Sequence, residues 1–202
     1  MLQVVTITEP TTEPVTTVEA KLHLRVTWAS DDDYIAALVA SARRLVQSRT
    51  GMRLFTQTIE IRADRWADFD TSGKSILSLR TSPIQSVTSV KYYNTDDIDT
   101  TYPDTSYWED LTGVPARIQI KNTADLPSLN SRIGNVRIRA VAGWATVGEI
   151  PEPFKTAIKL LVGHWYSTRE ESSEATLSSI PEGVSNLLMS VSENHHYDTG
   201  SM

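Results

Sequence analysis

The most strongly apolar periodic segment of the chain lies between Ile150 and Glu170. Its apolar residues recur at steps of three and four, which is the spacing of one helix face. They are Phe154, Ile158, Leu161 and Trp165, with Leu160, Val162 and Tyr166 widening the stripe. Pro151 and Pro153 suit a helix start, because an amide in the first turn has no helical partner to lose. So wide an apolar surface predicts a helix covered on most sides, by its own domain or by neighbouring chains.

Residues 32–50 show the same helical spacing of apolar side chains and predict a second long helix. The carboxylates of residues 31–33 can cap its free amides and favour the positive end of the helix dipole. Gly51 is well placed to end the helix in a left-handed conformation.

A short helix and an extended arm precede this long helix. Thr16 is a favourable N-cap for a helix over residues 17–24, with Val18 and Leu22 on one side. Residues 1–15 alternate apolar and polar until two prolines interrupt them, which indicates an extended arm of low intrinsic order or an edge strand.

After Gly51 the period changes from helical to alternating. Short strands are predicted over 55–63, 75–80, 87–94, 107–108, 116–121 and 135–144. The polar stretch 94–99 is predicted to be a turn. Short strands with regular turn signals are typical of an antiparallel sheet curled into a small sandwich or barrel.

These elements together predict an α+β fold, in which a helical bundle core carries an inserted antiparallel β module. After the apolar helix, residues 170–179 are polar and are expected to form a loop, and a short amphipathic helix should follow from residue 180. The expected boundaries are an extended arm over 1–15, a helical core over 16–53 and 146–190, a β module over 54–145 and a flexible tail over 191–202.

Composition narrows the function classes. The 202 residues include 19 basic and 25 acidic ones, for a formal net charge of −6, which disfavours dedicated nucleic-acid binding but allows DNA to pass without adhering. The absence of cysteine excludes disulfides, thiolate metal sites and a cysteine nucleophile. The apolar runs are too short to span a membrane, and the threonine-rich start does not resemble a signal peptide, so the expected compartment is the cytosol.

Candidate chemistry is sparse. His195, His196 and Asp198 resemble metal ligands, but adjacent histidines on a tail rarely converge on one ion, so a solvated tail is the preferred interpretation. Asp96, Asp97 and Asp99 resemble part of a calcium loop without its glycine and closing glutamate, so a hairpin tip is preferred. No nucleophile elbow or phosphate-binding loop is present. We expect no enzymatic activity, no metal and no cofactor.

The chain resembles the tailed-phage head–tail connectors, the adaptor proteins that sit under the portal. The resemblance covers nearly the whole chain in order and rests on residues 17–25, 31–43, Thr50-Gly51, Gln57-Thr58, 83–93, Ala142-Gly143-Trp144, 151–169 with its His-Trp-Tyr, and 180–188. Each motif alone is a capping or packing pattern. The chain departs from the family in its long N-terminal arm and in the polar tail past Met189.

The resemblance implies a ring, usually of twelve subunits in this family, that extends the DNA channel beneath the portal. It implies that one face docks on the portal protein and that the other receives a stopper or tail-completion protein. It places the chain in the virion neck after assembly in the host bacterial cytoplasm, and related adaptors occur in gene-transfer particles. DNA would pass without sequence-specific binding, and no membrane is involved.

The resemblance also implies that the C-terminal segment docks on the portal. The candidates are Leu187, Leu188, Met189, His195 and Tyr197. The alternative for the first three is a short helix packed on its own domain. We expect truncation after Gly183 to leave the subunit folded and to abolish portal attachment.

Contacts between subunits are expected at two places. One is the helix over residues 32–50, whose two ends carry charges of opposite sign, and the other is the aromatic end of the apolar helix. The candidates are Asp31, Asp32, Arg43, Arg44, Arg49, Trp165 and Arg169. Two identical neighbours must be met by two different surfaces of each subunit.

Three alternatives remain open. Another neck or tail-completion component would share the ring but contact different partners. A carbohydrate- or ligand-binding β module would use the aromatic residues Trp66, Tyr92, Tyr93, Tyr107 and Trp108, although such side chains more often pack strands together. A hydrolase is the third, and no nucleophile–base pair supports it.

Overall fold

The chain forms two units in the computed structural model, which describes residues 2–69, 75–122, 126–168 and 181–192. One is a β unit, made by Met1–Thr11 and Thr56–Ala145. The other is a helical unit, made by Thr12–Phe55 and Thr146–Met202. The chain therefore starts in the β unit, enters the helical unit, returns to the β unit and ends in the helical unit.

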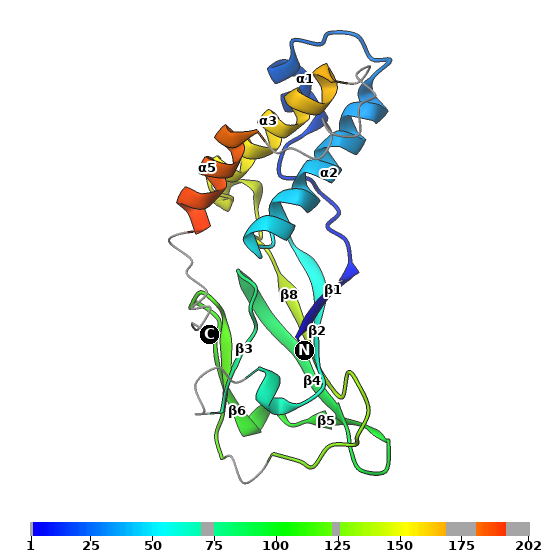
Figure 1. Ribbon diagram of the computed structural model, residues 1–202, viewed down its shortest axis with the longest axis vertical. Coiled ribbons are helices and arrows are strands. Elements are labelled where there is room, and N and C mark those ends of the chain that lie inside the picture. Colours follow the sequence, from blue (N-terminus) through cyan, green and yellow to red (C-terminus); the bar gives the residue numbers. More distant parts are fainter. Residues whose placement is uncertain (1, 70–74, 123–125, 169–180, 193–202) are drawn as a thin grey trace. The chain divides into compact units, whose positions relative to one another are not determined.

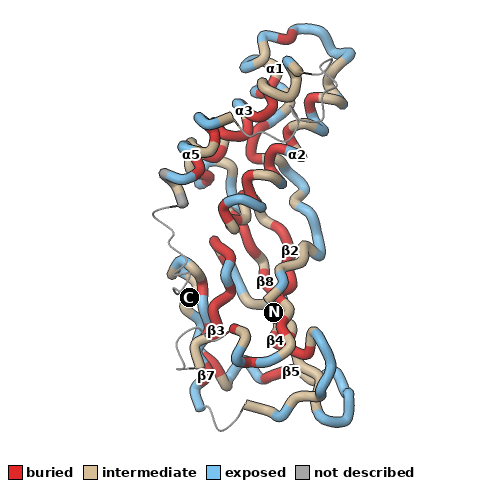
Figure 2. Tube along the Cα trace, viewed as in Figure 1, coloured by how far each residue is buried: buried red, intermediate tan, exposed pale blue. Residues whose placement is uncertain are grey.

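Four α-helices of the helical unit are described (Figure 1). They are α1 (Thr17–Leu24), α2 (Asp32–Thr50), α3 (Glu152–Ser167) and α5 (Glu182–Ser192). The long helices α2 and α3 pack together, and both contain buried stretches (Figure 2). Val39 of α2 and Leu161 of α3 are among their buried residues. Of the predicted stripe of α3, Phe154, Ile158, Leu161 and Val162 are buried in the helical core, whereas Leu160 is exposed and Trp165 and Tyr166 are half-buried.

The ends of these helices follow from local chemistry. Thr16 and Glu19 form a capping box at α1, in which each side chain accepts the other residue's backbone N–H. Gly51 ends α2 with φ 69°, as its sequence position predicts. Asp31 is the N-cap residue of α2, with Asp32 and Asp33 in the first turn, but the Asp31 side chain makes no capping hydrogen bond. It accepts instead from Tyr166 Oη at 2.5 Å and Trp28 Nε1 at 3.2 Å.

The β unit consists of two antiparallel sheets. Their strands are β1 (Gln3–Thr8), β2 (Gln57–Ala63), β3 (Ile76–Ser78), β4 (Ile84–Tyr93), β5 (Asp99–Tyr102), β6 (Tyr107–Asp110), β7 (Arg117–Ile120) and β8 (Val136–Ala142). Five form one sheet in the order β1-β2-β8-β4-β5, and three form another in the order β3-β7-β6. Short 3₁₀ helices occur at Trp66–Asp68, Asp104–Ser106 and, in the helical unit, Val147–Glu149.

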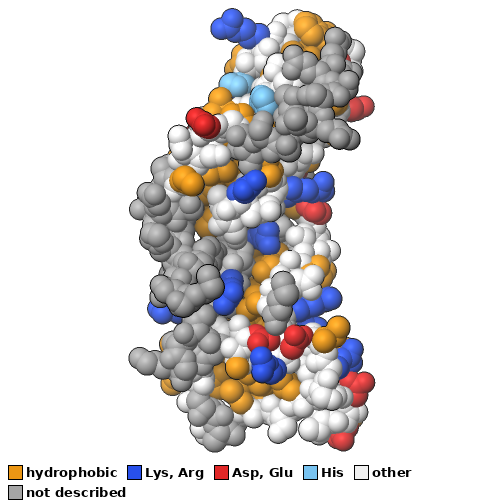
Figure 3. All heavy atoms as spheres, in the orientation of Figure 1, with side chains coloured by type: hydrophobic (Ala, Val, Ile, Leu, Met, Phe, Trp, Pro, Cys, Tyr) orange, Lys and Arg blue, Asp and Glu red, His pale blue; other side chains and the backbone are white. Residues whose placement is uncertain are grey.

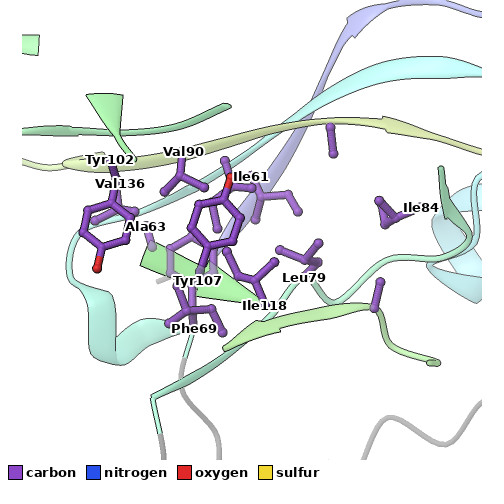
Figure 4. Close-up of a cluster of buried hydrophobic side chains, with 14 of the residues drawn as sticks. Ile61, Ala63, Phe69, Leu79, Ile84, Val90, Tyr102, Tyr107, Ile118 and Val136 are labelled. Carbon is purple, nitrogen blue, oxygen red and sulfur yellow. The ribbon is translucent and has the colours of Figure 1, made fainter. Parts of the chain in front are cut away.

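Both sheets contribute to one hydrophobic core (Figure 4). Ile61 and Val90 enter it from the five-stranded sheet, and Ile118 enters it from the three-stranded sheet. Phe69 and Leu79 fill the space beside them and are fully buried. The β unit is therefore a small sandwich, and the predicted α+β class is confirmed.

In the β unit the structure selects one of two alternatives for the start of the chain and adds one strand that was not expected. Residues 3–8 are an edge strand paired with β2, so the start of the chain is an integral part of the five-stranded sheet. Residues 99–102 form β5, which the alternation did not predict. The hairpin tip before it was predicted, and there the Asn94 side chain accepts the N–H groups of Asp96 and Ile98.

Candidate functional site

Three cationic side chains lie in register across the outer face of the five-stranded sheet. Side chains alternate along a strand, so Arg62 of β2, Arg137 of β8 and Lys91 of β4 face away from the buried residues that flank them. Arg62 is paired directly with Arg137, and Arg137 directly with Lys91. Like charges opposite one another destabilise a sheet, so this row requires anions nearby.

Carboxylates on the same face of the sheet supply part of this negative charge. Asp99 Oδ1 lies 2.7 Å from Arg137 Nη2, and its other oxygen lies 3.7 Å from Lys91 Nζ. Glu60 accepts from Arg62 Nε at 2.7 Å and from Arg139 Nη2 at 2.8 Å. Burial raises the pKa of Glu60, but the hydrogen bonds from the two arginines outweigh it and hold the pKa below its ordinary value.

Two of the guanidinium groups pack on the ring of Tyr93. The guanidinium carbons of Arg132 and Arg137 lie 3.9 and 4.4 Å from the centroid of the Tyr93 ring, within the range of cation–π attraction. Arg132 Nη1 donates to Asp97 at 2.9 Å, and this hydrogen bond raises the pKa of Arg132. Acidic and basic side chains are correspondingly interspersed on the visible face of the β unit (Figure 3).

These arginines surround an open cavity of about 640 Å³, which we call the arginine cavity. It is lined by Gln3, Arg62, Asp64, Tyr93, Arg132, Ile133, Gly134 and Arg137. Asp64 accepts the N–H of Gly134 at 2.7 Å, which lowers the pKa of Asp64. Among the lining side chains three are cationic and one is anionic, so the cavity attracts an anion.

Arg137 leaves part of its hydrogen-bonding capacity unused. Its Nε atom is buried and has no hydrogen-bond partner among the residues that the structure describes. A buried donor without a partner costs free energy, which a water molecule or a bound group would recover. A carboxylate or another oxyanion matches the planar fork of a guanidinium group.

Nothing in this cavity suggests catalysis or a metal. Its titratable side chains are arginines, one tyrosine beside two of them and one ionised aspartate, and they do not form a nucleophile–base pair. Within the described ranges no three histidine, aspartate or glutamate side chains form a group able to hold a metal ion. No helix among those residues is long and apolar enough to cross a membrane.

The C-terminal docking candidates divide between buried and exposed positions. Leu188 is 6% exposed and packs in the helical core, Leu187 is half-buried, and Met189 is 59% exposed. Helix α5 contacts α3 and α2, so Leu188 fits the alternative interpretation, in which a short helix packs on its own domain. His195 and Tyr197 lie outside the described residues.

The acidic interface candidates are engaged within the chain. Asp31 accepts hydrogen bonds from Tyr166 and Trp28, as described above. Asp32 lies 2.6 Å from Lys21 Nζ, which ties α1 to the start of α2. The structure thus gives both carboxylates a role in holding helices of their own unit together.

The remaining interface candidates differ in exposure. Arg43 is 2% exposed and pairs with Glu13, so its guanidinium group is not on the surface of the subunit. Arg44 and Arg49 are exposed, and Trp165 is half-buried near the end of α3. Arg169 lies outside the described residues.

Two apolar side chains that the sequence places on one side of α1 are exposed. Val18 and Leu22 share a face, as their spacing requires, but they are 77% and 81% exposed. Ala20 is the buried residue of this helix. An apolar helix face turned toward solvent is typical of a surface that another chain covers.

Sequence reasoning missed the arginine cavity. Alternation along residues 136–142 could have placed Arg137 and Arg139 on one face. It could not have shown that Arg62 of β2 pairs with Arg137, because that register depends on contacts 75 residues apart in the chain (137 − 62). Arg132 and Tyr93 join the site only through the folding of a loop onto the end of β4.

The aromatic residues do not form a binding platform. Trp66 lies with its ring centroid 6.0 Å from Tyr92 and 5.6 Å from Tyr102, and Tyr107 stacks on Tyr102. Tyr93 is occupied by the two arginines. Trp108 is exposed and lies under the ammonium group of Lys121. This arrangement supports packing rather than recognition of a sugar.

Comparison with solved structures identifies chains of the same fold over nearly the full length. One belongs to the neck of an empty GTA particle computed with C6 symmetry (TM-score 0.69, 20% identity, 94% of each chain covered). Another belongs to the virion of a native gene transfer agent (GTA) particle (TM-score 0.71, 20% identity, 93% of this chain and 94% of that one). A third belongs to the neck of a native GTA particle computed with C12 symmetry (TM-score 0.64, 23% identity, 94% and 93%).

Comparisons with protein-family models and with curated proteins found no match. The class defined by these observations is an α+β fold shared with chains of gene-transfer-agent particles.

Proposed function

We propose that the protein is a structural component of a particle neck, namely a head–tail connector that forms a ring beneath the portal. The observation that carries the proposal is the agreement of fold over 93–94% of the chain with proteins of the gene-transfer-agent neck and virion. The particle necks containing two of them were computed with C6 and C12 symmetry, which motivates a ring of identical copies here.

Physical features of the chain support this role. A ring closes when one surface of each subunit meets a different surface of the next, so each subunit needs two distinct contact patches. The exposed apolar face of α1, with Val18 and Leu22, is one candidate patch. The exposed Met189 of α5 is a candidate for the portal-facing end, together with the segment that follows it. A net charge of −6 suits a channel through which DNA passes without adhering.

Partners follow from this role. The chain would bind copies of itself, a portal protein, and a stopper or tail-completion protein on the opposite face. It would reside at the head–tail junction of a phage virion or a gene-transfer particle after assembly in the bacterial cytoplasm. Catalysis is not part of the proposed function.

Co-expression with the portal protein of the same genome tests the proposal. We expect the two proteins to co-purify, and negative-stain microscopy should show a second ring stacked on the portal ring. Native mass spectrometry of the complex gives the number of subunits. A chain that stays monomeric with the portal present and does not co-purify with it would contradict the proposal.

A further inference from the structure

The arginine cavity retains attraction for an anion after its internal pairs are formed. Arg62, Arg132 and Arg137 each have a carboxylate neighbour, but a guanidinium group carries five N–H donors, more than one carboxylate can accept. The buried Nε of Arg137 has no hydrogen-bond partner among the described residues. Because Arg62, Arg137 and Lys91 lie opposite one another in register, a further carboxylate would relieve repulsion that the sheet cannot avoid.

Two carboxylates of the same unit form no ion pair with any basic side chain that the structure describes. Asp104 lies in the 3₁₀ turn before β6, and Glu109 lies within β6, an edge strand of the three-stranded sheet. Burial raises the pKa of Glu109, and the charge of Asp104 raises it further. No basic side chain in the described part of the chain forms an ion pair with either residue, so a cation from outside the subunit would stabilise both charges.

These two patches are different surfaces of the β unit. Arg62, Tyr93 and Arg137 of the cavity belong to the five-stranded sheet, whereas Glu109 lies on an edge strand of the three-stranded sheet. Two different patches of a subunit can join identical copies head to tail. A self-complementary two-fold contact would instead require one patch to meet itself.

We propose that the arginine cavity of one copy receives the Glu109 carboxylate of a second copy of this chain, with Asp104 beside it. This inference rests on the proposed ring. It names the two surfaces of the β unit that orient neighbouring copies relative to each other. Guanidinium groups bind a carboxylate through two parallel hydrogen bonds, so the contact orients the two copies as well as attracting them. The pair is open to solvent and would weaken as salt concentration rises.

A nucleic-acid phosphate is a poorer occupant of the cavity. Asp64 lines it, and Asp97 and Asp99 pair with two of its arginines, so these carboxylates would repel a polyanion. A single carboxylate carries less charge than a polyanion and meets less of this repulsion. Binding of a DNA duplex is therefore kept as a competing outcome of the test.

The absence of cysteine from the chain permits a direct test by cross-linking. Ile133 lines the cavity and is 86% exposed, and Thr105 is an exposed neighbour of Asp104. The variants Ile133→Cys and Thr105→Cys are assembled together with the portal protein and treated with a short bismaleimide. We expect a covalent dimer that contains one copy of each variant. The matched control pairs Ile133→Cys with Ser48→Cys, an exposed position on α2, and should give none.

Charge reversal tests the ion pair itself. We expect Arg132→Glu to lower the yield of the cross-linked dimer by about tenfold or more, and a partner copy carrying Glu109→Arg to restore it. Arg65→Glu reverses an exposed charge of the same unit outside the cavity and should leave the yield unchanged. Circular dichroism checks that each variant is folded, and Arg132→Gln, which should give an intermediate yield, replaces Arg132→Glu if that variant is not.

The outcomes separate this inference from the proposed function. Rings that form without the cross-link between residues 133 and 105 would overturn the inference and leave the ring intact. Loss of DNA-duplex binding in Arg132→Glu, with rings and cross-linking unchanged, would overturn it in favour of a phosphate site. Failure to form any ring with the portal protein would overturn the proposed function and the inference together.

Discussion

Arg43 Nε donates to Glu13 Oε2 at 2.8 Å, although Arg43 is only 2% exposed and lies in the middle of α2. Glu13 belongs to the segment that leads from the β unit into α1. A buried guanidinium group is tolerated only when it is paired, so this carboxylate holds the incoming segment against α2.

Removal of the Glu13 carboxylate should destabilise the helical unit strongly. We expect Glu13→Ala to lower the unfolding free energy by about 3 kcal/mol, the lower end of the range for breaking a buried pair, because Glu13 is partly exposed. Arg43→Met should cost less, since the Glu13 carboxylate that loses its partner is partly exposed to solvent. Urea unfolding measures both. Arg65→Ala, which breaks the exposed pair with Asp68, serves as control and should change the free energy by less than about 1 kcal/mol.

Glu60 should make the stability of the β unit depend on pH. Its pKa in the folded state is below the ordinary 4.5, so it contributes stability above that pH, and this stability is lost as the pH falls through the lowered pKa. Glu60→Gln should therefore be less stable than the wild type at pH 7 and should lose less stability between about pH 5 and pH 3. Chemical unfolding across this range measures the difference. Parallel pH curves for the two proteins would contradict the assignment.

The same substitution should destabilise the subunit strongly at Leu161 and hardly at all at Leu22. Leu161 is fully buried between helices, so Leu161→Ala should cost about 2–5 kcal/mol of unfolding free energy. Leu22 is 81% exposed, and Leu22→Ala should change it by less than about 0.5 kcal/mol. If the α1 face is a contact between copies, Leu22→Ala should reduce ring formation while leaving the subunit folded. Thermal unfolding and native mass spectrometry separate the two effects.

A test of the C-terminal docking role needs a truncation after α5 rather than within it. Truncation after Gly183 would remove Val184 and Leu188, which are 1% and 6% exposed, so loss of binding there could reflect loss of packing. Truncation after Ser192, combined with Met189→Ser, spares both buried side chains. We expect an unchanged unfolding midpoint and at least about tenfold weaker portal binding. Unchanged portal binding by this variant would remove the C-terminal segment from the docking surface.

Several features were predictable from sequence because their causes are local. The helix over 32–50 follows from apolar spacing within one segment, and its end follows from a glycine at the position that needs positive φ. The capping box of Thr16 and Glu19 needs only residues three apart. The α+β class follows from the change of period after Gly51.

The candidate site was not predictable from the same patterns. Arg62, Arg137 and Lys91 become neighbours only when three strands from distant parts of the chain pair in one register. A shift of one residue in that register would turn each side chain to the other face. Sequence periodicity states which residues share a face, and it carries no information on which strand lies beside it.

Local patterns in the sequence predict the helices and most of the strands, with β5 as the exception, because capping, backbone conformation and period act over a few residues. The tertiary structure alone decided that Arg43 is buried against Glu13, that Val18 and Leu22 face solvent, and that three arginines surround one cavity. These outcomes depend on which surfaces meet after the chain has folded, since burial and charge pairing are properties of contacts between segments.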